Sequence, residues 1–138
     1  MSKPYVLDEQ VGFLLRQATQ RHVGIFSKLI SAELTPPQFS ALVILYQSGA
    51  CSQNELGRRI ATDGATIKGI IDRLSKRGLT QASADPEDGR MLVVSLTEAG
   101  AALAASCITT GGQISAATLA PLSTREQHSF LRLLKRLC

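Results

Sequence analysis

The chain has 138 residues, 44% of them hydrophobic, and a formal net charge of +4 at pH 7, which permits an anionic partner without identifying one. This is enough apolar material for one ordinary domain with a core, and no apolar run approaches the length of a membrane span. The first residues also lack the charged start and apolar stretch of a signal peptide, so we expect a cytoplasmic protein with no membrane partner.

Hydrophobic spacing and capping signals predict six helices and one β-hairpin. Three segments, 35–38, 52–55 and 123–126, have the capping-box form, in which a Ser or Thr hydroxyl accepts a backbone N–H and a Gln or Glu reaches back. Thr97 is expected to cap another helix, and the run 109–112 is a place where that helix can kink or break. The predicted helices are 8–31, 35–48, 52–60, 63–77, 97–117 and 123–137, with the hairpin at 79–96.

The first predicted helix carries His22 in the middle of an apolar stripe. A buried imidazole needs a partner, so His22 is either a satisfied core or interface residue or part of a binding site. Arg16 lies off that stripe. Its guanidinium either pairs with a nearby carboxylate, such as Asp8 or Glu9, or binds an anionic ligand, because two parallel N–H groups match the two oxygens of a carboxylate.

The helices 52–60 and 63–77 form a tandem pair. Leu56 and Ile60 on the first and an isoleucine-rich face on the second allow them to pack at a steep angle, and either Thr62 or Asp63 caps the second helix. Its outward face is typical of a helix in a DNA major groove, with early residues at base edges and later basic ones near phosphates. Gly69 costs roughly 1 kcal/mol relative to alanine inside a helix, which close approach to DNA or close helix packing can offset.

The segment 85–100 joins an acidic turn to an alternating strand and a helix start. The turn at Asp88-Gly89 places Arg90 at or beside the tip of the hairpin. If the chain is extended there, the Asp88 carboxylate can hold the Arg90 guanidinium in one orientation, which suits insertion into a narrow A·T-rich minor groove. The alternative is an ordinary hairpin with a surface ion pair. After two tandem helices, the hairpin indicates a winged helix-turn-helix.

These motifs resemble the MarR family of transcriptional regulators over nearly the whole chain. The resemblance rests on the long leading helix, the tandem helices, and the wing pattern Asp88-x-Arg90 followed by Leu96-Thr97-x-x-Gly100. It implies a mainly α fold with a small β-hairpin wing. Residues 1–138 would form a single domain, with the winged helix-turn-helix at 35–96 and dimerisation helices at 1–34 and 97–138.

The resemblance further implies a homodimer that binds a pseudo-palindromic double-stranded DNA operator. The expected DNA-binding residues are Asp63, Gly64, Ala65, Thr66, Lys68, Gly69, Arg73, Asp88 and Arg90. Family members commonly carry a basic residue where this chain has Gly89, so the groove contact should fall mainly on Arg90.

The run Phe13-Leu14-Leu15-Arg16 resembles the first helix of family members that control catabolism of aromatic acids. In those members the arginine binds the carboxylate of the ligand and a histidine further along helps bind the ring substituents. The resemblance therefore implies a repressor released by a small aromatic carboxylate, with Arg16, His22 and Tyr46 as ligand-binding residues. Tyr46 would supply a phenolic hydrogen bond in the same pocket.

The sequence leaves two alternative functions open. A redox-responsive regulator could act through Cys51, because the start of a helix can lower a thiol pKa, although the peroxide-sensing branch of the family uses a cysteine in the first helix, where this chain has none. A winged helix can also serve as a protein-interaction module. No nucleophile–base pair, phosphate loop or set of metal ligands is visible, so we expect neither an enzyme nor a cofactor or metal.

Overall fold

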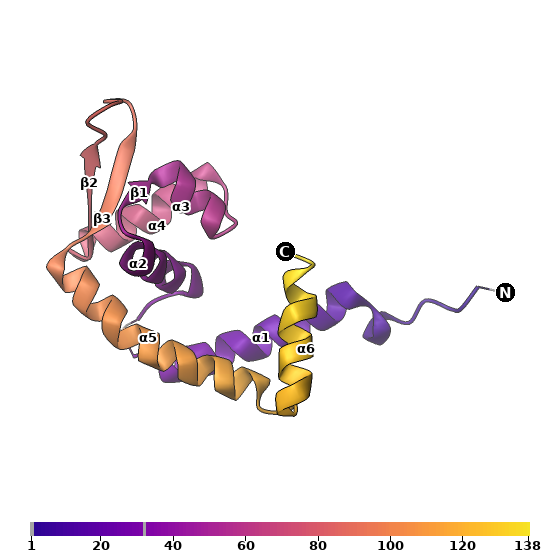
Figure 1. Ribbon diagram of the computed structural model, residues 1–138. Coiled ribbons are helices and arrows are strands. Elements are labelled where there is room, and N and C mark those ends of the chain that lie inside the picture. Colours follow the sequence, from indigo (N-terminus) through magenta and orange to yellow (C-terminus); the bar gives the residue numbers. More distant parts are fainter. Residues whose placement is uncertain (1, 32) are drawn as a thin grey trace. The chain divides into compact units, whose positions relative to one another are not determined.

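The computed structural model describes residues 2–31 and 33–138 (Figure 1). The described elements are a short 3₁₀ helix η1 (Leu7–Glu9), six α-helices and three strands. The helices are α1 (Val11–Leu29), α2 (Pro36–Ser48), α3 (Gln53–Arg59), α4 (Gly64–Lys76), α5 (Glu98–Leu119) and α6 (Thr124–Lys135), and the strands are β1 (Cys51–Ser52), β2 (Thr80–Ala84) and β3 (Leu92–Leu96).

The chain folds into two compact units. The central unit, Ile30–Thr110, holds α2 to α4, the sheet and the first part of α5. The terminal unit consists of the segments up to Leu29 and from Gly111 onward, and so holds α1, the last part of α5 and α6. The helix α5 belongs to both units, and each unit is described by itself below.

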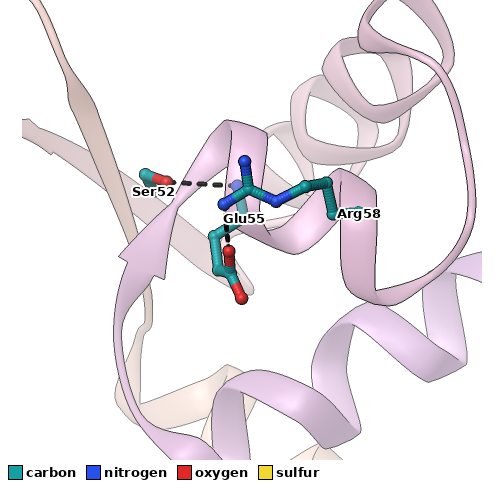
Figure 2. A network of polar contacts seen from close by, with 3 residues as sticks. All are labelled: Ser52, Glu55 and Arg58. Atoms are coloured by element: carbon teal, nitrogen blue, oxygen red, sulfur yellow. Dashed lines mark hydrogen bonds and ion pairs between the residues drawn. The ribbon is translucent and has the colours of Figure 1, made fainter.

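The three predicted capping residues Thr35, Ser52 and Ser123 are confirmed as N-caps, with one difference in detail. Thr35 and Ser123 form complete capping boxes with Gln38 and Glu126. Ser52 accepts the backbone N–H of Glu55 at 3.1 Å, but the Glu55 carboxylate pairs with Arg58 instead of reaching back (Figure 2). The guanidinium lies one turn along the same helix and offers the carboxylate a charged partner, which competes with the backbone N–H.

Two helices differ from the sequence prediction. The first does not run from residue 8, because Gln10 is extended (φ −88°, ψ 139°) and separates η1 from α1. The fifth is continuous through residues 109–112, so the expected break there is wrong. Glycine costs helix stability only on the order of 1 kcal/mol, and the many alanines of this helix offset that cost.

The sheet has three antiparallel strands in the order β1-β3-β2, one more than the predicted hairpin. The additional strand β1 pairs Cys51 with Val94 and Ser52 with Val93. A two-residue strand has no periodicity of its own, so the sequence gives no sign of it. Its pairing places the start of α3 beside the base of the hairpin, which extends beyond helices α2 to α4 (Figure 1).

The core of the central unit buries one face of α4 and so fixes which of its residues are exposed. The side chains of Ile67, Ile70, Ile71 and Leu74 are buried, and Leu56 of α3 is fully covered. A Cβ built on Gly57 would lie 3.2 Å from the Ile67 side chain, so the two helices approach closely at that glycine. The opposite face of α4 is left exposed.

Thr97 joins the sheet, the end of α4 and α5. Its hydroxyl donates to the Gly78 carbonyl oxygen at 2.6 Å and accepts the N–H of Gly100 at 3.0 Å, which confirms Thr97 as the helix cap. Its own N–H donates to the Leu79 carbonyl oxygen at 3.1 Å. A Cβ on Gly100 would lie 1.9 Å from that same oxygen, so no other residue type fits without moving the backbone.

We expect Gly100→Ala to destabilise the fold by roughly 1–3 kcal/mol, because the added methyl group overlaps the backbone of Leu79. Gly112→Ala is the matched control on the same helix, where a Cβ meets nothing within 4 Å. It should stabilise by about 0.5–1 kcal/mol. Urea unfolding of the two variants measures both changes, and equal stabilities would show that the junction does not constrain Gly100.

Candidate nucleic-acid interface and ligand pocket

The exposed face of α4 contains the residues predicted to meet DNA. Asp63 is the N-cap: its carboxylate accepts the backbone N–H of Thr66 at 2.7 Å, which decides between the two candidate caps. This hydrogen bond holds the pKa of Asp63 below its ordinary value, so the cap stays ionised at neutral pH. Gly64, Ala65, Thr66, Lys68 and Arg73 are exposed, and Gly69 is half-buried.

Gly69 does not serve helix packing. A Cβ at this position would meet a single atom within 4 Å, the Arg73 guanidinium nitrogen at 3.7 Å on the same helix. Gly64 has open space around it as well. Of the two explanations offered for a glycine inside α4, close helix packing is therefore wrong, and close approach of another molecule to the backbone remains.

The wing turn is ordered by its own carboxylates. Asp85 accepts the N–H groups of Glu87 and Asp88 at 2.8 and 3.4 Å. Asp88 accepts the backbone N–H of Arg90 at 3.0 Å, and not its guanidinium as the sequence suggested. An aspartate reaches the backbone two residues on more readily than the end of a long side chain, so the expected ion pair gives way to an Asx turn.

Three cationic side chains on this surface are free. In the part of the chain that the structure describes, 2–31 and 33–138, the charged ends of Lys68, Arg73 and Arg90 make no hydrogen bond or ion pair. Arg58 differs, because Glu55 holds its guanidinium (Figure 2). Lys68 and Arg73 on α4 and Arg90 in the wing are therefore available to bind an anion.

A small pocket of about 160 Å³ lies between α3 and the wing and adds residues that the sequence did not single out. Gln53 and Asn54 line it together with Arg90 and Met91. Sequence spacing could not have indicated this group, since 36 residues separate Asn54 from Arg90 and the two-residue strand β1 brings them together.

The terminal unit contains a second candidate site. A pocket of about 340 Å³ is lined by residues of α1, α5 and α6, and most of its surface is apolar. The lining residues are Leu15, Ala18, Thr19, His22, Ser115, Thr118, Leu119, Phe130, Leu131 and Leu134. This volume suits a small organic ligand.

His22 is half-buried on the wall of this pocket and has the partner that a covered imidazole needs. Its Nδ1 lies 2.8 Å from the Thr118 hydroxyl. Arg21 donates to the carbonyl oxygens of Thr118 and Ala117 at 2.7 and 3.1 Å, and so holds the end of α5 against α1. The sequence could not indicate Thr118, which lies 96 residues from His22 on a different helix.

The other two predicted ligand residues do not line the pocket in this chain. Arg16 is exposed on α1, one turn before Thr19, and has no hydrogen bond or ion pair among the described residues. The alternative of a pair with Asp8 or Glu9 is not observed, and Glu9 instead pairs with Lys3 at 3.6 Å. Tyr46 is exposed on α2 in the central unit, so its place in a shared pocket stays a prediction.

Cys51 is a half-buried strand residue. Burial raises the pKa of its thiol above the ordinary value, nearby Glu55 acts in the same direction, and Arg59 lowers it only in part. The lowered pKa expected from a helix start is therefore not found, and a raised pKa argues against a reactive thiolate at neutral pH. No three His, Cys, Asp or Glu side chains of the described segments are placed to hold a metal ion. No described helix is long and apolar enough to cross a membrane.

Comparisons with known proteins point to one group. A family model described as "MarR family" matches residues 34–92. The chain is 44% identical over 135 residues to the HTH-type transcriptional repressor NicR of Pseudomonas putida, covering 97% of this chain and 85% of that protein.

Solved structures agree in fold along almost the whole chain. A probable transcriptional regulator from Pseudomonas aeruginosa is 51% identical with a TM-score of 0.92, covering 96% of this chain and 100% of the other. Bordetella bronchiseptica BpsR, whose regulation of DNA binding by 6-hydroxynicotinic acid has been studied, is 40% identical with a TM-score of 0.93, covering 98% and 97% of the two chains.

We expect Cys51 to react with a thiol reagent several-fold more slowly near neutral pH than the exposed Cys138. Partial burial limits access of the reagent to Cys51, and the raised pKa lowers the fraction of its thiol that is ionised. Its rate should rise with pH through a midpoint above that of an ordinary thiol. Labelling of the native protein followed by peptide mass spectrometry measures both rates, with Cys51→Ser to assign the signal. If Cys51 reacts faster than Cys138, a redox-responsive regulator that acts through Cys51 would be favoured.

Proposed function

Since this chain belongs to the MarR family of transcriptional regulators, we propose that it represses transcription as a DNA-bound homodimer and leaves its operator when a small aromatic carboxylate binds. The observation that carries the proposal is the likeness, over nearly the full chain, to a transcriptional repressor and to BpsR, whose DNA binding responds to 6-hydroxynicotinic acid. That acid is itself a small aromatic carboxylate.

In this proposal, residues 35–96 bind DNA. The exposed side of α4 enters the major groove, with Thr66 and Lys68 reading base edges and Arg73 binding a phosphate. The absence of side chains at Gly64 and Gly69 lets the helix backbone approach the bases. Asp63 contributes by capping α4 at the end that meets the DNA, since a carboxylate in direct contact with phosphates would be repelled.

The wing binds the flanking minor groove through Arg90. The Asx turn of Asp88 fixes the backbone of Arg90 and leaves its guanidinium free. A free guanidinium can enter a narrow minor groove, where the negative potential is strongest. Asp88 thus acts on the position of Arg90 and does not neutralise its charge.

Dimerisation uses the helices in 1–34 and 97–138. In the single chain, large apolar residues of the terminal unit stay exposed, including Leu15 at 42%, Leu131 at 48% and Leu137 at 70%. Such a surface is typical of one that a partner covers. A two-fold dimer also presents two α4 helices to two half-sites, which explains why a pseudo-palindrome would be recognised.

The effector binds in the pocket of the terminal unit. Its apolar walls suit an aromatic ring, and His22 supplies a polar contact for a ring substituent. The unpaired guanidinium of Arg16, one turn before Thr19 on α1, is available for the carboxylate. Tyr46 of the central unit stays a predicted ligand-binding residue. A ligand shifts the dimer only through unequal affinity for its DNA-bound and free forms.

The DNA assignment predicts a footprint with two half-sites about one helical turn apart and an affinity that falls steeply with salt. Arg90→Ala should weaken binding roughly tenfold or more, or about 1.4 kcal/mol, at the flanks, because the minor-groove contact is lost. Lys68→Ala should mainly change the preferred bases inside each half-site. Footprinting and gel-shift titrations at several salt concentrations measure these effects.

Arg132→Ala is the control for this experiment, because it removes an equal charge from α6, outside the predicted DNA-binding segment. Its footprint and affinity should match those of the original protein. If neither Arg90→Ala nor Lys68→Ala changes the footprint, the assigned roles are wrong. A folded dimer that protects no specific site would favour a protein-interaction module.

The effector assignment predicts that 6-hydroxynicotinic acid or a hydroxybenzoate binds at least tenfold more tightly than its amide, a difference of about 1.4 kcal/mol, because the amide cannot pair with Arg16. Arg16→Ala should still bind the operator but no longer release it on addition of the acid, and His22→Ala should respond less strongly than the unchanged protein. Calorimetry and gel shifts measure binding and release.

Arg125→Ala on α6 is the matched loss of charge and should respond normally. A release from DNA caused by peroxide and abolished by Cys51→Ser, with no response to any acid, would replace the aromatic carboxylate by an oxidant as the signal.

A further inference from the structure

Glu55 and Arg58 form an ion pair on the surface of α3. The Arg58 side chain runs back along the helix, and its guanidinium donates to the Glu55 carboxylate (Figure 2). This hydrogen bond lowers the pKa of Glu55, so the carboxylate is ionised near neutral pH. The pair is open to solvent, since 73% of the Arg58 side chain and 42% of the Glu55 side chain are exposed. Another anion can therefore reach the guanidinium.

Arg58 lies on the side of α3 that borders the wing. Asn54 lines the small pocket between α3 and the wing together with Arg90. Arg58 follows Asn54 by four residues, so its side chain leaves the same face of the helix about 6 Å further along the axis. Both residues are exposed. Arg58, Asn54 and Arg90 therefore belong to one continuous surface.

A DNA strand that runs along this surface brings phosphates to Arg58. In the proposed function, Arg90 enters the minor groove, which is bordered by the two sugar-phosphate backbones, and a cation beside that groove meets phosphates. A carboxylate and a phosphate present the same kind of oxygen pair to a guanidinium. Glu55 and a phosphate would therefore compete for Arg58.

We propose that Arg58 is a binding site for a DNA backbone phosphate and that Glu55 weakens this site as an internal competitor for the guanidinium. The inference rests on the proposed function, because it adds a contact to the same DNA-binding surface. It gives α3 a share in the affinity for DNA beside α4 and the wing. Phosphate contacts carry no base information, so Glu55 sets the strength and the salt dependence of binding and leaves the choice of bases to α4.

The first test measures affinity against salt for Glu55→Gln, which removes the competing charge and keeps a side chain that can complete the capping box with Ser52. The probe is a double-stranded DNA of mixed sequence, followed by fluorescence anisotropy between about 50 and 200 mM salt. At the lower salt concentration the variant should bind roughly two- to fivefold more tightly, because an exposed ion pair no longer has to be broken. Its slope of log affinity against log salt should be steeper by about one, since one more phosphate is neutralised. An unchanged affinity and slope would contradict the proposal.

The second test asks whether this gain acts through Arg58. Arg58→Ala should weaken DNA binding by less than about twofold when Glu55 is present, and roughly two- to fivefold in the Glu55→Gln background. A general loss of negative charge would instead raise the affinity equally with or without Arg58. If Glu55→Gln gains as much affinity in Arg58→Ala as in the unchanged protein, the proposal is wrong.

Arg59→Ala is the matched control for Arg58→Ala, since Arg59 is the next residue on α3 and lines a different hollow with Pro36 and Phe39 of α2. Glu55→Gln should gain as much affinity in this background as in the unchanged protein. A gain that is lost in Arg59→Ala and kept in Arg58→Ala would overturn the assignment to Arg58.

Asp72→Asn is the matched control for Glu55→Gln, because it removes an exposed carboxylate from α4. It should raise the affinity by the same factor whether or not Arg58 is present. Thermal unfolding checks that every variant folds.

The failure of this inference differs from the failure of the proposed function. If neither the unchanged protein nor Glu55→Gln binds double-stranded DNA, the proposed DNA-binding function and this inference are both wrong. If DNA is bound and Arg90→Ala weakens the binding, but Glu55→Gln and Arg58→Ala show no coupling, the proposed function stands and the competition at Arg58 is wrong.

Discussion

The junction at Thr97 is the constraint on which the central unit depends. One threonine caps α5, binds the carbonyl oxygen of Gly78 through its hydroxyl and binds that of Leu79 through its N–H. The missing side chain of Gly100 lets the two backbones meet. The end of α4, the first residue of the hairpin and the start of α5 are thereby held together, so α4 and the wing beside it share one fixed base.

The helix α5 contributes residues to both units. It runs as one helix from Glu98 to Leu119, and Thr118 near its end lines the pocket of the terminal unit. The helix continues through residues 109–112, where sequence composition argued for an interruption.

On the surface formed by α3, α4 and the wing, the charge available to a ligand depends more on which side chains have partners than on how many charged residues there are. Net charge is a weak guide here, because acidic residues are interspersed with the basic ones in the helix-turn-helix and wing. In the structure, these charged side chains differ in whether they already have a partner within the chain. Glu55 occupies Arg58, and the carboxylates of Asp63, Asp85 and Asp88 are used on backbone N–H groups. Lys68, Arg73 and Arg90 are left to bind an anion.

The sequence by itself determined the features that depend on neighbours along the chain. Capping residues such as Thr35, Ser123 and Thr97, the apolar face of α4 and the turn at Asp88-Gly89 act within a few residues, so their pattern predicted most helices, the wing and the family. Tertiary structure decided the rest. The strand β1, the approach of Asn54 to Arg90 and the pairing of His22 with Thr118 join residues far apart in sequence, and no local pattern records them. Cys51 and Asp88 show the same limit, because the burial of a thiol and the choice between two hydrogen-bond donors depend on what the folded chain brings near.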